Sequence, residues 1–236
     1  MSSLSTVQLN ELDAIFFSIL KKNLSNDAFG WLESKAESIR TEDKSLQLNQ
    51  AFSQLPNHAG KNLSAVSEEE LTKLKERAPG FSTEGWSIDR LGRVWLLMQV
   101  SPADKDGYLK KINGLFTASE MNEQVALYSA LPFYSYPEEW IGIAENGIRS
   151  NIGTVLEAIM YHNPFAAEYL SENSFNQLVL KAFFTEKDVT KITGLYSRIN
   201  KALQDTLSDY IAERTAAHRT VEPNIYKLIE LKNTEI

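Results

Sequence analysis

The sequence contains no cysteine. That absence excludes disulfide bonds, thiolate nucleophiles and every zinc site that uses sulfur ligands. Basic residues are also outnumbered: 24 Lys and Arg stand against 31 Asp and Glu, which gives a formal net charge of -7. Nucleic acids and anionic membrane surfaces both require a basic face on the protein that binds them. We therefore expect no nucleic-acid partner for this chain.

Long hydrophobic runs are missing as well. The most apolar stretch near the start, residues 15–20, is too short to cross a bilayer. Acidic residues precede it, and two lysines, Lys21 and Lys22, follow it. This is the reverse of the charge order in a secretory signal peptide. The sequence therefore predicts a cytoplasmic protein with no transmembrane segment.

The common catalytic motifs are absent too. The sequence has no G-x-S-x-G, no H-E-x-x-H and no G-x-G-x-x-G. Its three histidines, His58, His162 and His218, never fall at metal-ligand spacing within one helix. These absences predict a protein with no metal and no other cofactor, and they favour a non-catalytic role over an enzymatic one.

What the sequence does have is helical periodicity along most of its length. In residues 6–23, for example, Leu12, Ile15, Phe16 and Ile19 fall on one stripe. Short links between the predicted helices make successive helices antiparallel neighbours. The pattern predicts an all-α fold, built as an irregular stack of antiparallel helix hairpins (an α-α superhelix of the HEAT or armadillo kind). A closed helical bundle is the alternative.

The predicted helices extend over the whole chain, so we expect a single all-helical domain spanning residues 1–236. The segment 56–66 is the one candidate for a loose boundary, because it contains Pro56 and Gly60 between two helical stretches. Ser67 and Glu70 directly after it form a capping-box pattern, which predicts that a helix begins there.

Two charged features are predicted to lie at the surface. Asp89 and Arg93 are four residues apart on one predicted helix, the spacing of a solvent-exposed ion pair. Lys181 is the only charged residue in the apolar run 178–184. Its alignment with Ser174 and Gln177 favours a solvated edge over a buried amine of lowered pKa.

Two turns in the second half combine aromatic residues with proline, at 132–137 and at 161–165. The helices predicted at 137–149 and 151–161 rise by about 18 and about 16 Å, so the second returns to the end where the first began. The two turns should therefore lie at the same end of the fold.

The helix predicted at 199–218 adds charge to that end, provided that 185–198 is only a turn. Its apolar stripe continues at helical spacing into Arg214 and His218. A guanidinium on a core-facing stripe needs a carboxylate partner, because an uncompensated buried charge is strongly destabilising. Glu157 is the predicted partner of Arg214.

Together these residues predict a ligand-binding site in the second half. Charged groups that converge with aromatic rings in a concavity are typical of such a site. The alternative is structural, since Arg and His are favoured near a helix C-terminus by its dipole, and aromatic or proline residues in turns often serve packing alone. The predicted site residues are Tyr136, Trp140, Glu157, Tyr161, His162, Asn163, Arg214 and His218, with no metal ligand among them.

Several segments of the chain resemble the EboA-domain family. They include Glu-Asn-Gly-Ile-Arg-Ser-Asn at 145–151, His-Asn-Pro-Phe at 162–165 and the apolar run at 176–184. Gly-Trp-Ser-Ile-Asp at 85–89 fits the same pattern. The likeness covers about residues 80–220 and is looser over the amino-terminal third.

The resemblance implies a setting rather than a reaction. Proteins similar to this one are encoded in a conserved bacterial gene cluster, whose neighbouring products resemble a prenyltransferase of the UbiA type and several small-molecule enzymes. In some cyanobacteria such a cluster is linked to the delivery of a secondary-metabolite precursor toward the periplasm. The resemblance assigns no catalytic residue.

The preferred interpretation is a non-catalytic accessory protein of such a gene cluster. It would bind a small or prenylated metabolite, or hold enzymes of the same gene cluster together. The first alternative is an enzyme that acts on such a metabolite in a polar and aromatic pocket of the C-terminal half. The second alternative is a pure protein-interaction scaffold.

Overall fold

The computed structural model describes residues 4–42 and 44–231 of the chain. Within these ranges the chain forms α-helices, short 3₁₀ helices and loops, and no β-strand longer than an isolated bridge. The predicted all-α fold is confirmed. The helices are α1 (Thr6–Asn23), α2 (Asn26–Thr41), α3 (Ser45–Ala59), α4 (Glu68–Arg77), α5 (Ile88–Met98), α6 (Lys105–Ala118), α7 (Met121–Ser129), η1 (Leu131–Phe133), η2 (Pro137–Trp140), α8 (Ile141–Arg149), α9 (Gly153–Met160), α10 (Phe165–Tyr169), α11 (Glu172–Phe184), η3 (Val189–Lys191), α12 (Lys201–Ala216) and α13 (Asn224–Glu230).

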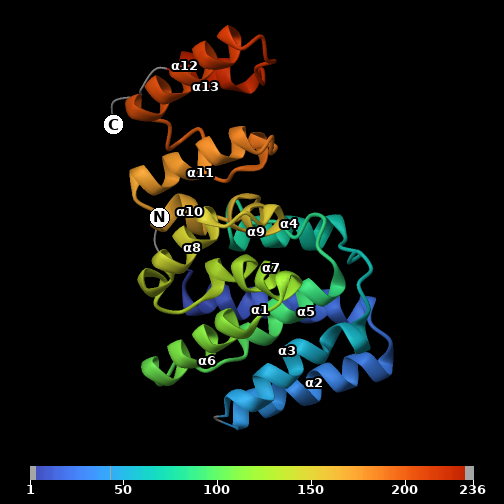
Figure 1. Ribbon diagram of the computed structural model, residues 1–236. Helices are drawn as coiled ribbons and strands as arrows, with labels where there is room; N and C mark the ends of the chain where they lie inside the picture. The colour runs from blue at the N-terminus through green and yellow to red at the C-terminus, as the bar shows by residue number, and fades with distance from the viewer. Residues whose placement is uncertain (1–3, 43, 232–236) are drawn as a thin grey trace.

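The helices form a stack (Figure 1). Helices α2 and α3 lie at one end of it, and α12 and α13 lie at the other. Between the ends, α3 packs against α5, α5 against α7 and α7 against α9, so helices that are not neighbours in sequence form a row through the molecule. The prediction of a helical stack is therefore confirmed, while a HEAT-like or armadillo-like superhelix stays a prediction. Among the described residues, none of the helices combines the length and the hydrophobicity that a membrane span requires.

Helix α5 lies inside the stack and is buried on nearly every side. It packs against α1, α3 and α7, and Leu91, Val94 and Leu96 are fully buried. Gly92 permits the close approach of α3, because a Cβ at this position would lie 2.8 Å from Cδ2 of Leu55. These contacts make α5 a rigid base for the loop that leads into its first turn.

The segment considered as a domain boundary connects the end of α3 to α4. The predicted capping box is present there: the Ser67 hydroxyl accepts from the backbone N–H of Glu70, whose side chain accepts from the backbone N–H of Ser67 at 2.9 Å. Glu70 also pairs with Lys22 of α1 at 2.6 Å. The single-domain organisation stays a prediction.

Hydrogen bonds also fix the loop that precedes α5. The backbone N–H of Ser64 donates to the carbonyl oxygen of Trp86 at 2.9 Å, and the N–H of Ile88 donates to that of Asn62 at 2.8 Å. Ser87 occupies the N-cap position of α5, but its side chain makes no capping hydrogen bond. The first turn of α5 is therefore positioned by the loop at 62–64 rather than by its own cap.

The segment 185–198 is not the simple turn assumed from the sequence. It contains η3, and Ile192 forms an isolated bridge with Tyr161. Beyond it, α12 packs against α13, and Nε2 of Gln204 donates to three backbone carbonyl oxygens at the end of α13. The segment therefore runs back to the turn after α9, so α12 begins at that end of the fold and leads away from it.

Candidate functional site

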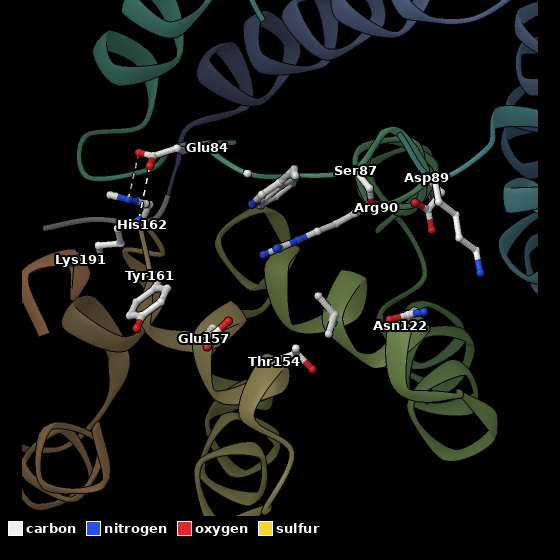
Figure 2. A pocket seen from close by; sticks show the side chains of 14 residues that line it. Glu84, Ser87, Asp89, Arg90, Asn122, Thr154, Glu157, Tyr161, His162 and Lys191 are labelled. Atoms are coloured by element: carbon white, nitrogen blue, oxygen red, sulfur yellow. Dashed lines mark hydrogen bonds and ion pairs between the residues drawn. The ribbon is translucent and has the colours of Figure 1, made fainter. Parts of the chain in front are cut away.

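A cleft of about 530 Å³ opens at the N-terminal end of α5 (Figure 2). One wall is formed by the segment 84–90, which includes the first turn of α5. The facing wall comes from α7 and α9, and a further side comes from the segment that follows α9 and from η3. We call this the central cleft; its lining residues are Lys61, Glu84, Gly85, Trp86, Ser87, Asp89, Arg90, Asn122, Val125, Thr154, Glu157, Tyr161, His162 and Lys191.

Backbone hydrogen bonds join the walls of the central cleft at His162. Its carbonyl oxygen accepts from the N–H of Ser82 at 3.2 Å, and its own N–H donates to the carbonyl oxygen of Lys191 at 3.0 Å. The backbone of His162 is left-handed, with a φ of 50°, a conformation that costs a non-glycine residue about 1–2 kcal/mol. The two hydrogen bonds stabilise this conformation, so three segments far apart in sequence meet at one residue.

Arg90, in the first turn of α5, extends into the cleft between α5 and the helix that carries Glu157 (Figure 2). Its Nε donates to Oγ of Ser129 at 2.8 Å, and its guanidinium carbon lies 4.3 Å from the centroid of the Trp86 ring. Burial lowers the pKa of Arg90 to about 10, and Glu157 and Asp89 oppose that shift. The guanidinium is therefore charged at neutral pH, and the stacked ring restricts its orientation.

Asp89 and Arg93 form a buried ion pair, not the solvent-exposed pair predicted from the sequence. Each residue is only 3% exposed, and Nη1 of Arg93 lies 2.7 Å from Oδ2 of Asp89. Nε of Arg93 donates to the carbonyl oxygen of Phe52 at 2.9 Å, so the packing of α3 on α5 covers the pair. The other carboxylate oxygen of Asp89, Oδ1, is buried and has no hydrogen-bond partner among the described residues.

Glu157 and Tyr161 are held by the segment that follows α11. The carboxylate of Glu157 forms an ion pair with Lys187, so Glu157 is not the partner of Arg214 predicted above. The hydroxyl oxygen of Tyr161 accepts from the backbone N–H of Asp188 at 2.7 Å. Burial raises the pKa of Tyr161, so its phenol is neutral at physiological pH.

Glu84 lies against two basic residues of the cleft, Lys191 and His162. Its Oε1 is 3.4 Å from Nζ of Lys191, and its Oε2 is 3.6 Å from Nε2 of His162 (Figure 2). The second distance exceeds a hydrogen bond, and Nε2 of His162 is buried with no partner among the described residues. Burial lowers the pKa of His162, an effect that Glu84 opposes, so the imidazole is mainly neutral at pH 7.

Three of the eight predicted site residues, Glu157, Tyr161 and His162, lie together in the central cleft. Asn163 is buried next to His162: its side-chain amide donates to two backbone carbonyl oxygens, at 3.1 and 2.8 Å, and accepts from one backbone N–H. Asn163 thus stabilises the turn after α9 through the backbone. No group of three or more His, Asp or Glu residues in the described part is placed to hold a metal ion.

The other four predicted residues lie outside the central cleft. Trp140 is fully buried, and its Nε1 and the hydroxyl of Tyr136 each donate to a backbone carbonyl oxygen, at 2.8 and 2.7 Å. Arg214 lines a separate groove, and His218 is exposed. The path of the chain through η3 is the reason that α12 does not deliver these two side chains to the turn after α9.

Sequence reasoning missed Trp86, Asp89 and Arg90 as residues of one site. A signal was present, because Trp86 and Arg90 are four residues apart and Arg90 lies on the helix predicted to carry Asp89 and Arg93. That spacing does not reveal which side of α5 is covered. Burial of Asp89 and the hydrogen bond from Arg90 depend on α3 and α7, which are distant in sequence.

Comparison with protein-family models gives a match over most of the chain. A family model described as "Metabolite traffic protein EboA" matches residues 12–230. The resemblance seen in the sequence is therefore confirmed, and it extends well beyond the stretch at about 80–220. No match was found among curated proteins or among solved structures.

Proposed function

Because the chain belongs to the EboA family of metabolite traffic proteins, we propose that it binds a small metabolite in the central cleft without changing it covalently. The single observation that carries the proposal is that the guanidinium of Arg90 extends into this cleft with no protein partner for its outer nitrogens among the described residues. Trp86 and Tyr161, which also line the cleft, provide aromatic surface.

Unpaired buried polar atoms are uncommon, and each costs roughly 1–3 kcal/mol when a partner is lost. Four such side-chain atoms occur among the described residues, and two of them, Oδ1 of Asp89 and Nε2 of His162, belong to residues that line the central cleft. Both atoms are inaccessible to solvent, so a ligand would have to displace the side chains around them in order to reach them and remove this cost. The same two atoms would then select ligands by hydrogen bonding.

The charges of the cleft favour binding over catalysis. Its two glutamates, Glu84 and Glu157, are each engaged by a lysine, Lys191 and Lys187 respectively. A general base must be able to take a proton from its substrate and release it again. Carboxylates held in ion pairs are better suited to fixing the walls of a binding site.

The setting is part of the same proposal. We place the protein in the cytoplasm, as an accessory component of a bacterial secondary-metabolite gene cluster. Its ligand would be a small or prenylated metabolite, and enzymes of the same gene cluster would deliver it or receive it. The resemblance of the sequence and the family description support this setting.

Native mass spectrometry tests the proposal on protein purified from cells that express the whole gene cluster. Thr154 lies on the α9 wall of the central cleft and is exposed, so Thr154→Trp should fill the cleft. Thr117→Trp, at an exposed position near the end of α6, is the matched control. We expect one reproducible added mass on the wild type and on Thr117→Trp, and none on Thr154→Trp. Bare wild-type protein, or equal loading of both variants, would contradict the proposal.

A further inference from the structure

We infer that the metabolite carries a terminal oxyanion, a carboxylate or a phosphate, and that Arg90 binds it through Nη1 and Nη2. This inference rests on the proposed function, since it names the chemical class of the ligand in the central cleft. It makes Arg90 the residue that determines specificity, and Trp86 and Ser129 the residues that position it.

The contacts of Arg90 orient it toward a ligand. Ser129 takes the hydrogen bond from Nε, and Trp86 lies against the guanidinium. The remaining donors, on Nη1 and Nη2, have no acceptor among the described residues, and no carboxylate there lies within 4 Å of them. Two parallel N–H groups match the paired oxygens of a carboxylate or phosphate, which is why arginine binds such groups bidentately.

The nearest carboxylates do not neutralise Arg90, because other cations engage them. Asp89 is paired with Arg93 at 2.7 Å, and Glu157 is paired with Lys187. Burial opposes the charge on Arg90, as its lowered pKa indicates. An anion in the cleft would supply the missing countercharge where it is only weakly screened by water.

Two other arginines, the buried Arg93 and the partly buried Arg198, are satisfied by the protein's own atoms. Arg93 has Asp89 and a backbone carbonyl oxygen as partners. Nη1 of Arg198 donates to three backbone carbonyl oxygens, at 2.8 to 3.3 Å, while its guanidinium lies over the ring of Phe175. Arg90 has the same kind of aromatic support as Arg198 but no acceptor for its outer nitrogens, which distinguishes a binding residue from a structural one.

The start of α5 adds further donors beside Arg90. Ser87 makes no capping hydrogen bond, and the backbone N–H groups of Asp89 and Arg90 have no acceptor among the described residues. N–H groups at a helix N-terminus favour negative charge. An oxyanion held by Arg90 would lie close to this end of the helix.

Calorimetric titration with three small probes tests the inference: benzoate, phenyl phosphate and the neutral benzamide. We expect the wild type to bind at least one of the two anions and to bind benzamide at least tenfold more weakly. The anion that binds more tightly identifies the oxyanion as a carboxylate or a phosphate. Equal binding of benzamide and the anions would overturn the inference.

Three variants test whether anion binding depends on the side chain of Arg90. Arg90→Gln should weaken anion binding by about tenfold to a hundredfold, the effect of losing a charge-assisted bidentate contact. Arg90→Lys keeps the charge but loses the paired donors, so it should fall between Arg90→Gln and the wild type. Arg214→Gln, which changes an arginine outside the cleft, should bind like the wild type. Anion binding by folded Arg90→Gln at wild-type strength would contradict the inference.

The outcomes separate this inference from the proposed function. If native mass spectrometry shows a ligand that Thr154→Trp loses and Arg90→Gln retains, the cleft binds a metabolite but Arg90 does not select it, and only the inference fails. If the wild type carries no ligand and binds none of the three probes, both fail. Loss of the natural ligand from both Thr154→Trp and Arg90→Gln, with Arg214→Gln still loaded, supports both.

Discussion

Two arginines of this protein have similar local surroundings and different structural positions. Arg90 lies over Trp86 at 4.3 Å in the central cleft, and Arg214 lies over Tyr210 at 5.6 Å in a groove of about 590 Å³ between η3 and the α12–α13 hairpin. Each also donates one hydrogen bond from Nε. Arg90 donates to a side chain of another helix, α7, whereas Arg214 donates to a backbone carbonyl oxygen only six residues further along the chain.

An arginine on the apolar stripe of a helix is therefore not by itself a sign of a binding site. The hydrogen bond of Arg214 forms within the C-terminal hairpin, so it needs no contact with the rest of the fold. Arg90 is held between α5 and α7, and its outer nitrogens extend into the cleft (Figure 2). Whether such an arginine belongs to a binding site depends on tertiary contacts, which the sequence pattern of a single helix does not reveal.

The largest expected effect comes from breaking the buried pair at the start of α5. Asp89→Ala would leave Arg93 buried, with Glu123 at 3.8 Å as its remaining acidic neighbour. We expect the free energy of unfolding to fall by about 3–5 kcal/mol, the cost typical of an unpaired buried charge. Urea denaturation at neutral pH measures it.

The matched control for this change lies in the C-terminal hairpin. Asp205 forms an ion pair with Lys201 at the same four-residue spacing, but both side chains are exposed. Asp205→Ala should lower the free energy of unfolding by less than about 0.5 kcal/mol. Similar losses in both variants would show that burial does not distinguish the two pairs.

This contrast also shows how far the sequence could be interpreted. Periodicity and caps are local, so the helices, the stack and the Ser67–Glu70 capping box could all be predicted. The burial of Asp89 and Arg93 could not, because the spacing of an ion pair is the same on an exposed face and on a covered one. Only the packing of α3 on α5 distinguishes the two cases.

The candidate site, like the fold, could be predicted from the sequence only where it depends on local contacts. Glu157, Tyr161 and His162 lie near one turn, so their proximity follows from local sequence. The placement of Arg214 and His218 required the direction of α12, which depends on the path of the whole segment 185–198. That segment contains only a three-residue 3₁₀ helix, which has too little periodicity to be recognised in the sequence.

A smaller effect on the free energy of unfolding should distinguish Arg90 from Arg214. Arg90→Met keeps apolar contact with Trp86 and removes a cation that the protein does not pair. We expect the free energy of unfolding of the ligand-free protein to stay constant or to rise by up to about 1 kcal/mol, since binding groups commonly lower stability. Arg214→Met should change it by less than about 0.5 kcal/mol.

Thermal and urea unfolding of the two purified variants provide the measurement. A loss of more than about 1 kcal/mol in Arg90→Met would mean that Arg90 has a structural role, because a residue kept for binding is not needed by the empty fold. Such a loss would make the two arginines alike and would remove the distinction drawn above.

The smallest expected effect concerns the two histidines with left-handed backbone, His162 with a φ of 50° and His218 with a φ of 52°. Burial lowers the pKa of His162 below its ordinary value of 6.5. The folded protein therefore binds a proton at this site less readily than the unfolded chain does. The protein therefore keeps its full free energy of unfolding above pH 6.5. It loses part of that free energy as the pH falls through the lowered pKa of His162 in the folded state.

Unfolding measured across this range should therefore show a pH dependence that His162→Asn removes. Asparagine tolerates the left-handed backbone, so the substitution adds little strain of its own. His218→Asn is the matched control at an exposed position, and it should retain the pH dependence of the wild type. If His162→Asn and the wild type lose stability in parallel below pH 6.5, other groups cause that loss. The imidazole would then contribute to the cleft through its shape and its fixed backbone rather than through its protonation.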